Sequence, residues 1–189
     1  MVTWIEWVSY MNELSLYILD ITQNSLKANA KNIDLIINED KVSDLLTITL
    51  IDDGKGMSKE VLEKVTSPFF TTRTTRHVGL GLPLFKELCE LCEGGLKIES
   101  EVGKGTSLCA TFKLSSIDLP PFGNLIDTLY LLIINEENAD IKYKHIKNNK
   151  TFEFDTKEIK EILDGVSIKD PMLMSWFKDF IQEGFNELD

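Results

Sequence analysis

The feature of this sequence that most constrains its fold is a set of four short polar segments between Asp20 and Thr106. Each segment lies beside an element whose apolar residues follow a helical or a strand period. Each is a weak signal alone, but their order and spacing together are informative. The four segments are 20-DITQNSLK-27, 52-DDGKG-56, the run from 68-PFFTTRTTR-76 to 79-GLGL-82, and 103-GKGT-106.

Apolar periodicity places these segments on helices, strands and loops. Leu14, Ile18 and Ile21 recur at steps of three and four residues, which predicts a helix over about 14–30. Runs rich in β-branched residues predict four strands, and a polar turn separates the first two. The predicted strands cover 33–38, 46–52, 96–102 and 107–114.

Capping residues predict where the other helices begin and end. Ser58 is a predicted N-cap for a short helix that reaches about residue 65. Pro83 lies in the first turn of a further predicted helix, and Gly94 follows its end. After a break in composition near Pro120, we expect a helix, a hairpin and two more helices. These elements begin near 123, turn at 148–149, and cover 156–163 and 171–188.

The first polar segment places Asp20, Asn24 and Lys27 on one edge of its helix, within about 60° of one another. An amide oxygen can ligate Mg²⁺, which keeps several waters and favours phosphate oxygens. The ammonium can pair with a phosphate, and the carboxylate can orient a nucleophile. A solvated helix flank is the alternative interpretation of this segment alone.

The second segment follows a hydrophobic strand and contains Asp52, Gly54 and Gly56. Glycines allow the backbone to approach a flat ligand closely. The Asp52 carboxylate can accept a hydrogen bond from an exocyclic amine such as that of adenine. A simple Asp-Gly turn is the alternative.

The third segment predicts a long, mobile loop over 66–81. This loop contains no acidic residue, although the chain has a net charge of −11. Gly79 and Gly81 precede a predicted helix, and a helix N-terminus attracts anions. Arg73 and Arg76 add donors suited to phosphate. This loop therefore predicts a phosphate site.

The fourth segment, 103–106, opens a strand and is consistent with a plain hairpin turn. It lacks the spacing of a phosphate-binding P-loop, and the chain also lacks the glycine pattern of Rossmann folds.

In this order the segments resemble the boxes of the GHKL superfamily, which comprises gyrase-type, chaperone, histidine kinase and mismatch-repair ATPases. The N box corresponds to Asp20 and Asn24, and the G1 box begins at Asp52. The F box lies at 68–70, the G2 box at 79–81 and the G3 region at 105–106. The resemblance covers about 14–114.

The resemblance implies an α+β fold, a two-layer sandwich in which helices cover one face of a mixed sheet and ATP lies under a flexible lid. We expect an ATP-binding domain over 1–116 and a small α/β extension over 117–189, arranged as helix, hairpin and helix. Residues 1–10 are a candidate extended or non-native start, because Met11 opens the patterned sequence.

Carried over to this sequence, the resemblance implies that Asp20 is catalytic and that Asn24 ligates Mg²⁺ bound to the phosphates. Asp52 would bind adenine, and Thr106 would support the water network beside it. The implied ATP contacts are Asn24, Lys27, Asp52, Gly54, Gly56, Met57, Phe69, Thr72, Arg73, Arg76, Gly79, Leu80, Gly81, Leu82 and Thr106.

Lys27 and the lid resemble most the histidine kinase branch, but neither His77 nor His145 sits in a phosphoacceptor-helix pattern. We therefore expect a stand-alone kinase-like regulator that transfers the γ-phosphate of ATP to a separate protein partner. The alternative is an ATP-dependent switch, or a weak ATPase, that gates partner binding without phosphorylation. The family usually has Glu at the position of Asp20, and the shorter carboxylate puts efficient hydrolysis in question.

Net charge and cysteine content limit which partners we expect besides ATP, and they indicate the cellular compartment. The net charge of −11 argues against nucleic acid and against anionic membranes. Three cysteines, without a signal peptide or a membrane-length apolar run, indicate the cytoplasm. A homodimer is left open.

Three further patterns are expected to be structural. Cys89 and Cys92 form a C-x-x-C inside a helix, which favours core thiols over a redox or zinc pair. Four lysines between 142 and 150 favour a solvated hairpin, with an acidic partner as the alternative. The apolar stripe of helix 171–188 favours packing on its own domain, with docking as the alternative.

Overall fold

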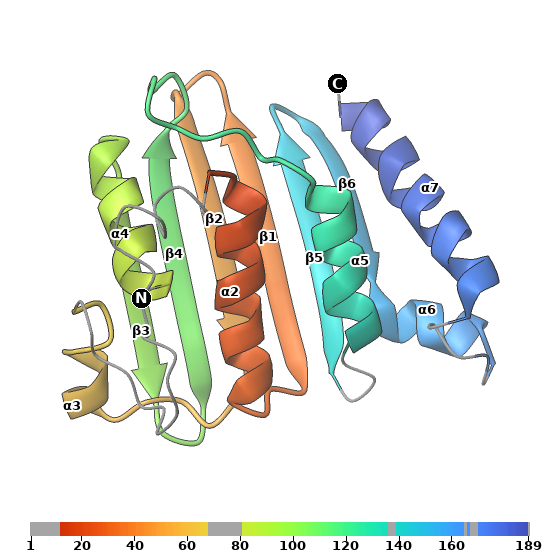
Figure 1. The fold of residues 1–189 in the computed structure, drawn as a ribbon, viewed down its shortest axis with the longest axis horizontal. Coiled ribbons are helices and arrows are strands. Elements are labelled where there is room, and N and C mark those ends of the chain that lie inside the picture. The colour runs from red at the N-terminus through yellow and green to blue at the C-terminus, as the bar shows by residue number, and fades with distance from the viewer. Residues whose placement is uncertain (1–11, 68–80, 136–138, 165, 167–169, 189) are drawn as a thin grey trace, which may run out of the picture.

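A computed structural model describes residues 12–67, 81–135, 139–164, 166 and 170–188. Within these residues six strands form one mixed sheet, in the order β3-β4-β2-β1-β5-β6 (Figure 1). All neighbouring strands are antiparallel except β1 and β5, which are parallel. The strands are β1 (Asn32–Asp40), β2 (Leu45–Asp52), β3 (Gly95–Glu101), β4 (Gly105–Lys113), β5 (Asp140–Lys147) and β6 (Lys150–Asp155).

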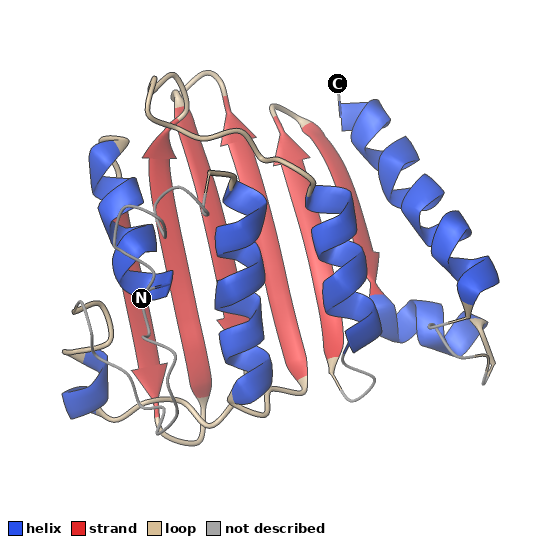
Figure 2. Ribbon diagram, viewed as in Figure 1, coloured by secondary structure: helices blue, strands red, loops and turns tan. Residues whose placement is uncertain are grey.

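Helices cover one face of this sheet (Figure 2). The described helices are α2 (Leu14–Lys27), α3 (Lys59–Leu62), α4 (Gly81–Leu91), α5 (Leu125–Asn135), α6 (Thr156–Ile162) and α7 (Pro171–Leu188). The architecture confirms the predicted α+β sandwich. None of the helices in the described ranges is long and apolar enough to cross a membrane.

Buried and exposed side chains alternate along the strands, which explains why helices cover only one face of the sheet. In β2, Leu46, Ile48 and Leu50 point into the core and are buried, while Ile51 on the other side is 42% exposed. Side chains two residues apart in a strand share a face, so the apolar face meets the helices. The core therefore lies between the sheet and α2, α4, α5 and α7.

The predicted element boundaries are close to those observed. Helix α2 ends at Lys27, before the expected end at Ala30, because Asn29 adopts a left-handed backbone with φ 61°. The Ser58 hydroxyl accepts a hydrogen bond from the Val61 N–H, as its predicted role as an N-cap requires.

The segment beyond residue 116 extends the same sheet. Strand β5 pairs with β1 along its length, from Asn32 opposite Asp140 to Glu39 opposite Lys147. The connecting segment also crosses the start of α2, where the N–H groups of Leu14 and Ser15 donate to carbonyls at 2.9 and 3.0 Å. The acceptors are Pro121 and Phe122. One continuous core therefore spans both parts of the chain. The division into two domains stays a prediction.

The apolar face of the extension forms an aromatic cluster between β5, β6 and α7. His145 is 6% exposed, and its Nδ1 and Nε2 atoms lie 3.0 Å from the Tyr143 hydroxyl and 2.8 Å from Glu39 Oε1. On α7, Phe177 and Ile181 are buried, as predicted for its apolar stripe, although Trp176 is half-exposed.

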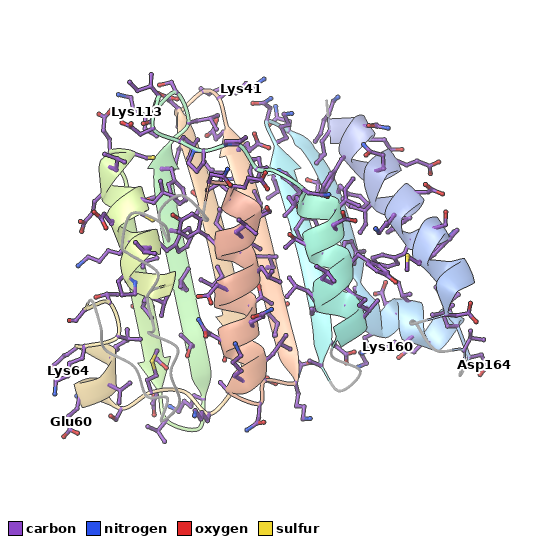
Figure 3. The ribbon with its side chains drawn as sticks, viewed as in Figure 1. Lys41, Glu60, Lys64, Lys113, Lys160 and Asp164 are labelled. Carbon is purple, nitrogen blue, oxygen red and sulfur yellow. The ribbon has the colours of Figure 1, made fainter. Side chains whose placement is uncertain are left out.

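Two local features are the burial of the cysteine pair and a lysine contact in the extension. Cys89 and Cys92 are fully buried, as predicted, and burial raises the pKa of the Cys89 thiol to about 12. In the extension, the Lys160 ammonium of α6 donates to the Ala139 carbonyl and the Asp140 carboxylate, at 2.9 and 2.8 Å. Lys160 thereby fixes α6 to the start of β5 (Figure 3).

A chain that ends at Ser116 is expected to lose the cooperative fold. Without β5, the β1 edge would expose unpaired backbone groups, and part of the core would lose its cover. We expect aggregation, or a broad unfolding transition, in urea titrations followed by circular dichroism. A fragment 1–116 that unfolds cooperatively at the same urea midpoint as the whole chain would support an autonomous domain instead.

Candidate functional site

Three polar side chains form a row across the sheet at the end where β2 stops, the lower end in Figure 1. Thr106 is the cross-strand partner of Asp52 on one side and of Ser100 on the other. By strand alternation all three share the face that α2 and α4 cover, since Leu50, Leu108 and other buried residues lie on it. The sheet thus brings its last polar row under the helices.

Asp52 is held on both carboxylate oxygens. Asp52 is buried, with 6% of the residue exposed. The Ser25 hydroxyl of α2 donates to Oδ2 at 2.7 Å, and the Gly54 N–H donates to Oδ1 at 2.9 Å. A carboxylate oxygen accepts more than one hydrogen bond, so Asp52 retains acceptor capacity in a fixed orientation. It is suited to bind a donor such as an exocyclic amine.

The carboxylate of the neighbouring Asp53 contacts the backbone just before and at the start of β1. Its carboxylate accepts hydrogen bonds from the Lys31 and Asn32 N–H groups, at 2.6 and 2.9 Å, and from the Asn32 side chain at 2.6 Å. Desolvation alone would raise the pKa of Asp53, but these hydrogen bonds outweigh it and the pKa is lowered. Asp53 therefore ties the loop after β2 to the loop before β1.

Two glycines permit the close backbone packing of this loop. Gly56 has φ +64°, and a Cβ there would collide with the Glu101 carbonyl. Gly105 has φ +103°, and a Cβ there would collide with the Asp52 carbonyl. Both backbones require glycine, because L side chains strain at these angles and the space is filled. The glycines therefore pack the site's own backbone together.

The polar edge of α2 meets the first residue of α4. The Asn24 amide nitrogen donates to Asp20 Oδ2 at 3.3 Å, so the predicted pair shares one edge. A Cβ on Gly81 would collide with the Asp20 carboxylate, so α4 begins against that carboxylate. The amide oxygen of Asn24 is a hard ligand of the kind that Mg²⁺ prefers.

The structure brings together most predicted residues within the described ranges. Asp52 contacts α2 through Ser25, Gly54 lies against Ala28, and the Met57 N–H donates to Ser100. Lys27 is exposed in the last turn of α2, and Leu82 packs on the core in the first turn of α4. The predicted residues Phe69, Thr72, Arg73, Arg76, Gly79 and Leu80, and His77, lie outside the described residues.

Two contributing residues are absent from the set predicted for the site. Ser25 follows Asn24 directly and is buried on α2, four residues after Ile21, and its hydroxyl contacts Asp52. Ser100 lies opposite Thr106 across a short turn. The register of that hairpin is the signal that could have identified Ser100.

The residues present fit a magnesium-bound adenine nucleotide. Asp52 offers an oriented acceptor to an amine, and Asn24 offers an amide oxygen beside a second carboxylate. Mg²⁺ bound to nucleotide phosphates takes few protein ligands, which matches this sparse donor set.

The sequence profile of a protein family described as "Histidine kinase-, DNA gyrase B-, and HSP90-like ATPase" matches residues 11–116, more than half of the chain. The chain belongs to this family. The family match therefore covers α2, all of β1 to β4 and the complete polar row. It ends close to the predicted boundary at residue 116.

The curated relatives of this ATPase-family chain include several bacterial kinases. Over 105 residues the chain is 33% identical to Sporulation kinase C of Bacillus subtilis, which covers 56% of this chain and 24% of that protein. Over 84 residues it is 36% identical to Sensor protein kinase PilS of Pseudomonas aeruginosa, which covers 42% of this chain and 16% of that protein. The chain thus spans about a quarter or less of these relatives.

A solved structure shares the fold of this ATPase-family chain. The N-terminal domain of a DNA repair protein superposes with a TM-score of 0.50 at 14% identity. The match covers 76% of this chain and 52% of that one. At this identity the similarity supports the fold alone.

Proposed function

We propose that this ATP-binding, kinase-like protein transfers the γ-phosphate of ATP to a separate protein partner in the cytoplasm. The observation that carries the proposal is the pairing of an oriented adenine acceptor, Asp52, with the Asp20–Asn24 edge where α4 begins. Because Asn24 and Ser25 are adjacent in the C-terminal half of α2, a base at Asp52 and phosphates at the Asp20–Asn24 edge would lie close enough together to belong to one nucleotide. The three free cysteines are consistent with a reducing compartment.

Three residues of α2 would each have a separate role in phosphoryl transfer. Asp20 would orient the attacking hydroxyl or imidazole of the partner, and Asn24 would hold the magnesium ion. When bound, Mg²⁺ neutralises charge that develops on the transferred phosphoryl group. Lys27, in the exposed last turn, would pair with a phosphate or with the partner.

The surroundings of His145 favour an acceptor on another molecule. His145 is buried, and Tyr143 and Glu39 already occupy its two ring nitrogens. A phosphoacceptor imidazole needs one accessible nitrogen, which this residue lacks. The proposed phosphoacceptor is therefore a residue of the separate partner.

The test is incubation of the purified protein with γ-labelled ATP and lysate of the source cell. We expect one labelled protein, and loss of the label with Asn24→Ala. Acid-stable label indicates hydroxyl phosphorylation, and acid-labile label indicates a phosphohistidine or an acyl phosphate. Tight Mg-ATP binding with no labelled protein would overturn the transferase proposal.

The alternative function is an ATP-dependent switch, or a weak ATPase, that gates partner binding. The contact between α2 and the connecting segment favours it, since the N–H groups of Leu14 and Ser15 donate to Pro121 and Phe122. A nucleotide that shifts α2 would therefore reach the extension. Amide hydrogen exchange at Leu14 and Ser15 that is identical with ATP, with ADP and without nucleotide would exclude this route.

A further inference from the structure

Ser100, outside the residues predicted for the site, joins three parts of it. Its hydroxyl oxygen lies 2.9 Å from the Met57 N–H, 2.8 Å from the Gly105 carbonyl and 3.0 Å from the Thr106 hydroxyl. These groups belong to the loop after β2 and to the start of β4. One side chain of β3 thus contacts both glycine-containing loops.

Counting hydrogens fixes the direction of each of these bonds. A serine hydroxyl has one hydrogen, and a carbonyl oxygen can only accept. The Ser100 hydrogen must therefore go to Gly105, and Ser100 accepts from Met57. The remaining bond then requires Thr106 to donate its own hydrogen to Ser100.

Thr106 therefore has no hydrogen left for a ligand and can only accept. Asp52, its cross-strand partner, is also an acceptor, because Ser25 and Gly54 donate to it. Cross-strand partners on one face have neighbouring side chains. A base edge that reaches Asp52 thus meets two groups that both demand a donor.

We infer that Ser100 is a positioning residue that sets base specificity by holding the Thr106 hydroxyl as an acceptor. The inference rests on the proposed nucleotide function and deepens it. The amine at position 6 of adenine carries two hydrogens, one for each acceptor. A purine with a carbonyl at position 6 offers only its single N1–H and places a third acceptor at this edge, so it binds more weakly.

The test compares dissociation constants of Mg-ATP and Mg-ITP by calorimetry, since ITP carries the carbonyl and a protonated N1. We expect the wild type to prefer ATP, and Ser100→Ala to reduce that preference about 10-fold because Thr106 can rotate and donate. Ser100→Thr keeps a hydroxyl and is expected to keep the preference. Ser107→Ala, on the uncovered face of β4, is the matched control and is expected to change nothing.

A double-mutant cycle separates positioning from general loosening of the loops. Thr106→Val should reduce the preference by itself, and adding Ser100→Ala should have no further effect on it. If Ser100→Ala fails to fold, the nearly isosteric Ser100→Cys, a weak hydrogen-bonding group, replaces it. ATP binding with a preference that Ser100→Ala or its replacement leaves unchanged overturns this inference alone. Absence of ATP binding by the wild type overturns the proposed function as well.

Discussion

Replacing Asp52 with asparagine is expected to weaken Mg-ATP binding about 100-fold, the scale of a lost hydrogen bond to a charged group. Three donors would converge on this side chain: the Ser25 hydroxyl, the Gly54 N–H and the amine of the base. A carboxylate offers two oxygens to them, whereas the amide offers one oxygen and turns its NH₂ toward a donor. The loss should appear in the dissociation constant measured by calorimetry.

The matched control for this prediction is Asp34→Asn. Asp34 also lies on a central strand, but it is exposed on the uncovered face, so this variant removes the same charge without touching the site. We expect its affinity to stay within about twofold of the wild type. A folded Asp52→Asn variant, verified by circular dichroism, that binds Mg-ATP as tightly as the wild type would refute the assignment of the base site.

The second large effect is expected for Gly105→Ala, which should lower the free energy of unfolding by about 3 kcal/mol. The new methyl group would collide with the Asp52 carbonyl, and the backbone angle of +103° strains any L side chain. Both strands would have to separate at the polar row, so nucleotide affinity should fall with stability. Urea unfolding gives the stability, and calorimetry gives the affinity.

Substitutions at two other glycines distinguish backbone strain from the steric collision as the cause of this loss of stability. Gly103 has φ +78°, and among the described residues no atom other than those of its chain neighbours lies within 4 Å of the position that a methyl group would take. Gly103→Ala should therefore cost only the strain, about 1 kcal/mol. Gly95 has no positive φ, and within the described part of the chain only its sequence neighbours lie near the position of an added methyl group. Gly95→Ala should therefore change stability by less than about 0.5 kcal/mol. If Gly105→Ala costs no more than Gly103→Ala, the collision is not what makes Gly105 necessary.

Several features of the fold and the site could be predicted from local sequence patterns, because they depend on residues that are close together in the chain. The 3.6-residue period placed Asp20 and Asn24 on one helix edge, and the structure has them in contact. The residues Ser58 and Pro83 marked helix starts close to where they occur, since capping depends on neighbours in the chain. The two-residue period of β2 identified its buried face and the position of Asp52 at its end.

Other features of the fold could not be predicted in this way, because they depend on which strands pair in the sheet. Nothing in residues 117–155 indicates that β5 pairs in parallel with β1, because that pairing depends on side chains a hundred residues apart. For the same reason the placement of the two strands of the extension at one edge of this sheet came from the tertiary structure.

The sequence by itself determined the order of the elements, the family resemblance and the residue types available for binding a nucleotide. The tertiary structure alone decided which hydroxyl donates to which acceptor. Ser25 meets Asp52 across 27 positions of the chain, and Ser100 meets Met57 across 43. Such bonds arise from helix packing and strand register, and these depend on the burial of the whole apolar face rather than on any local run of residues.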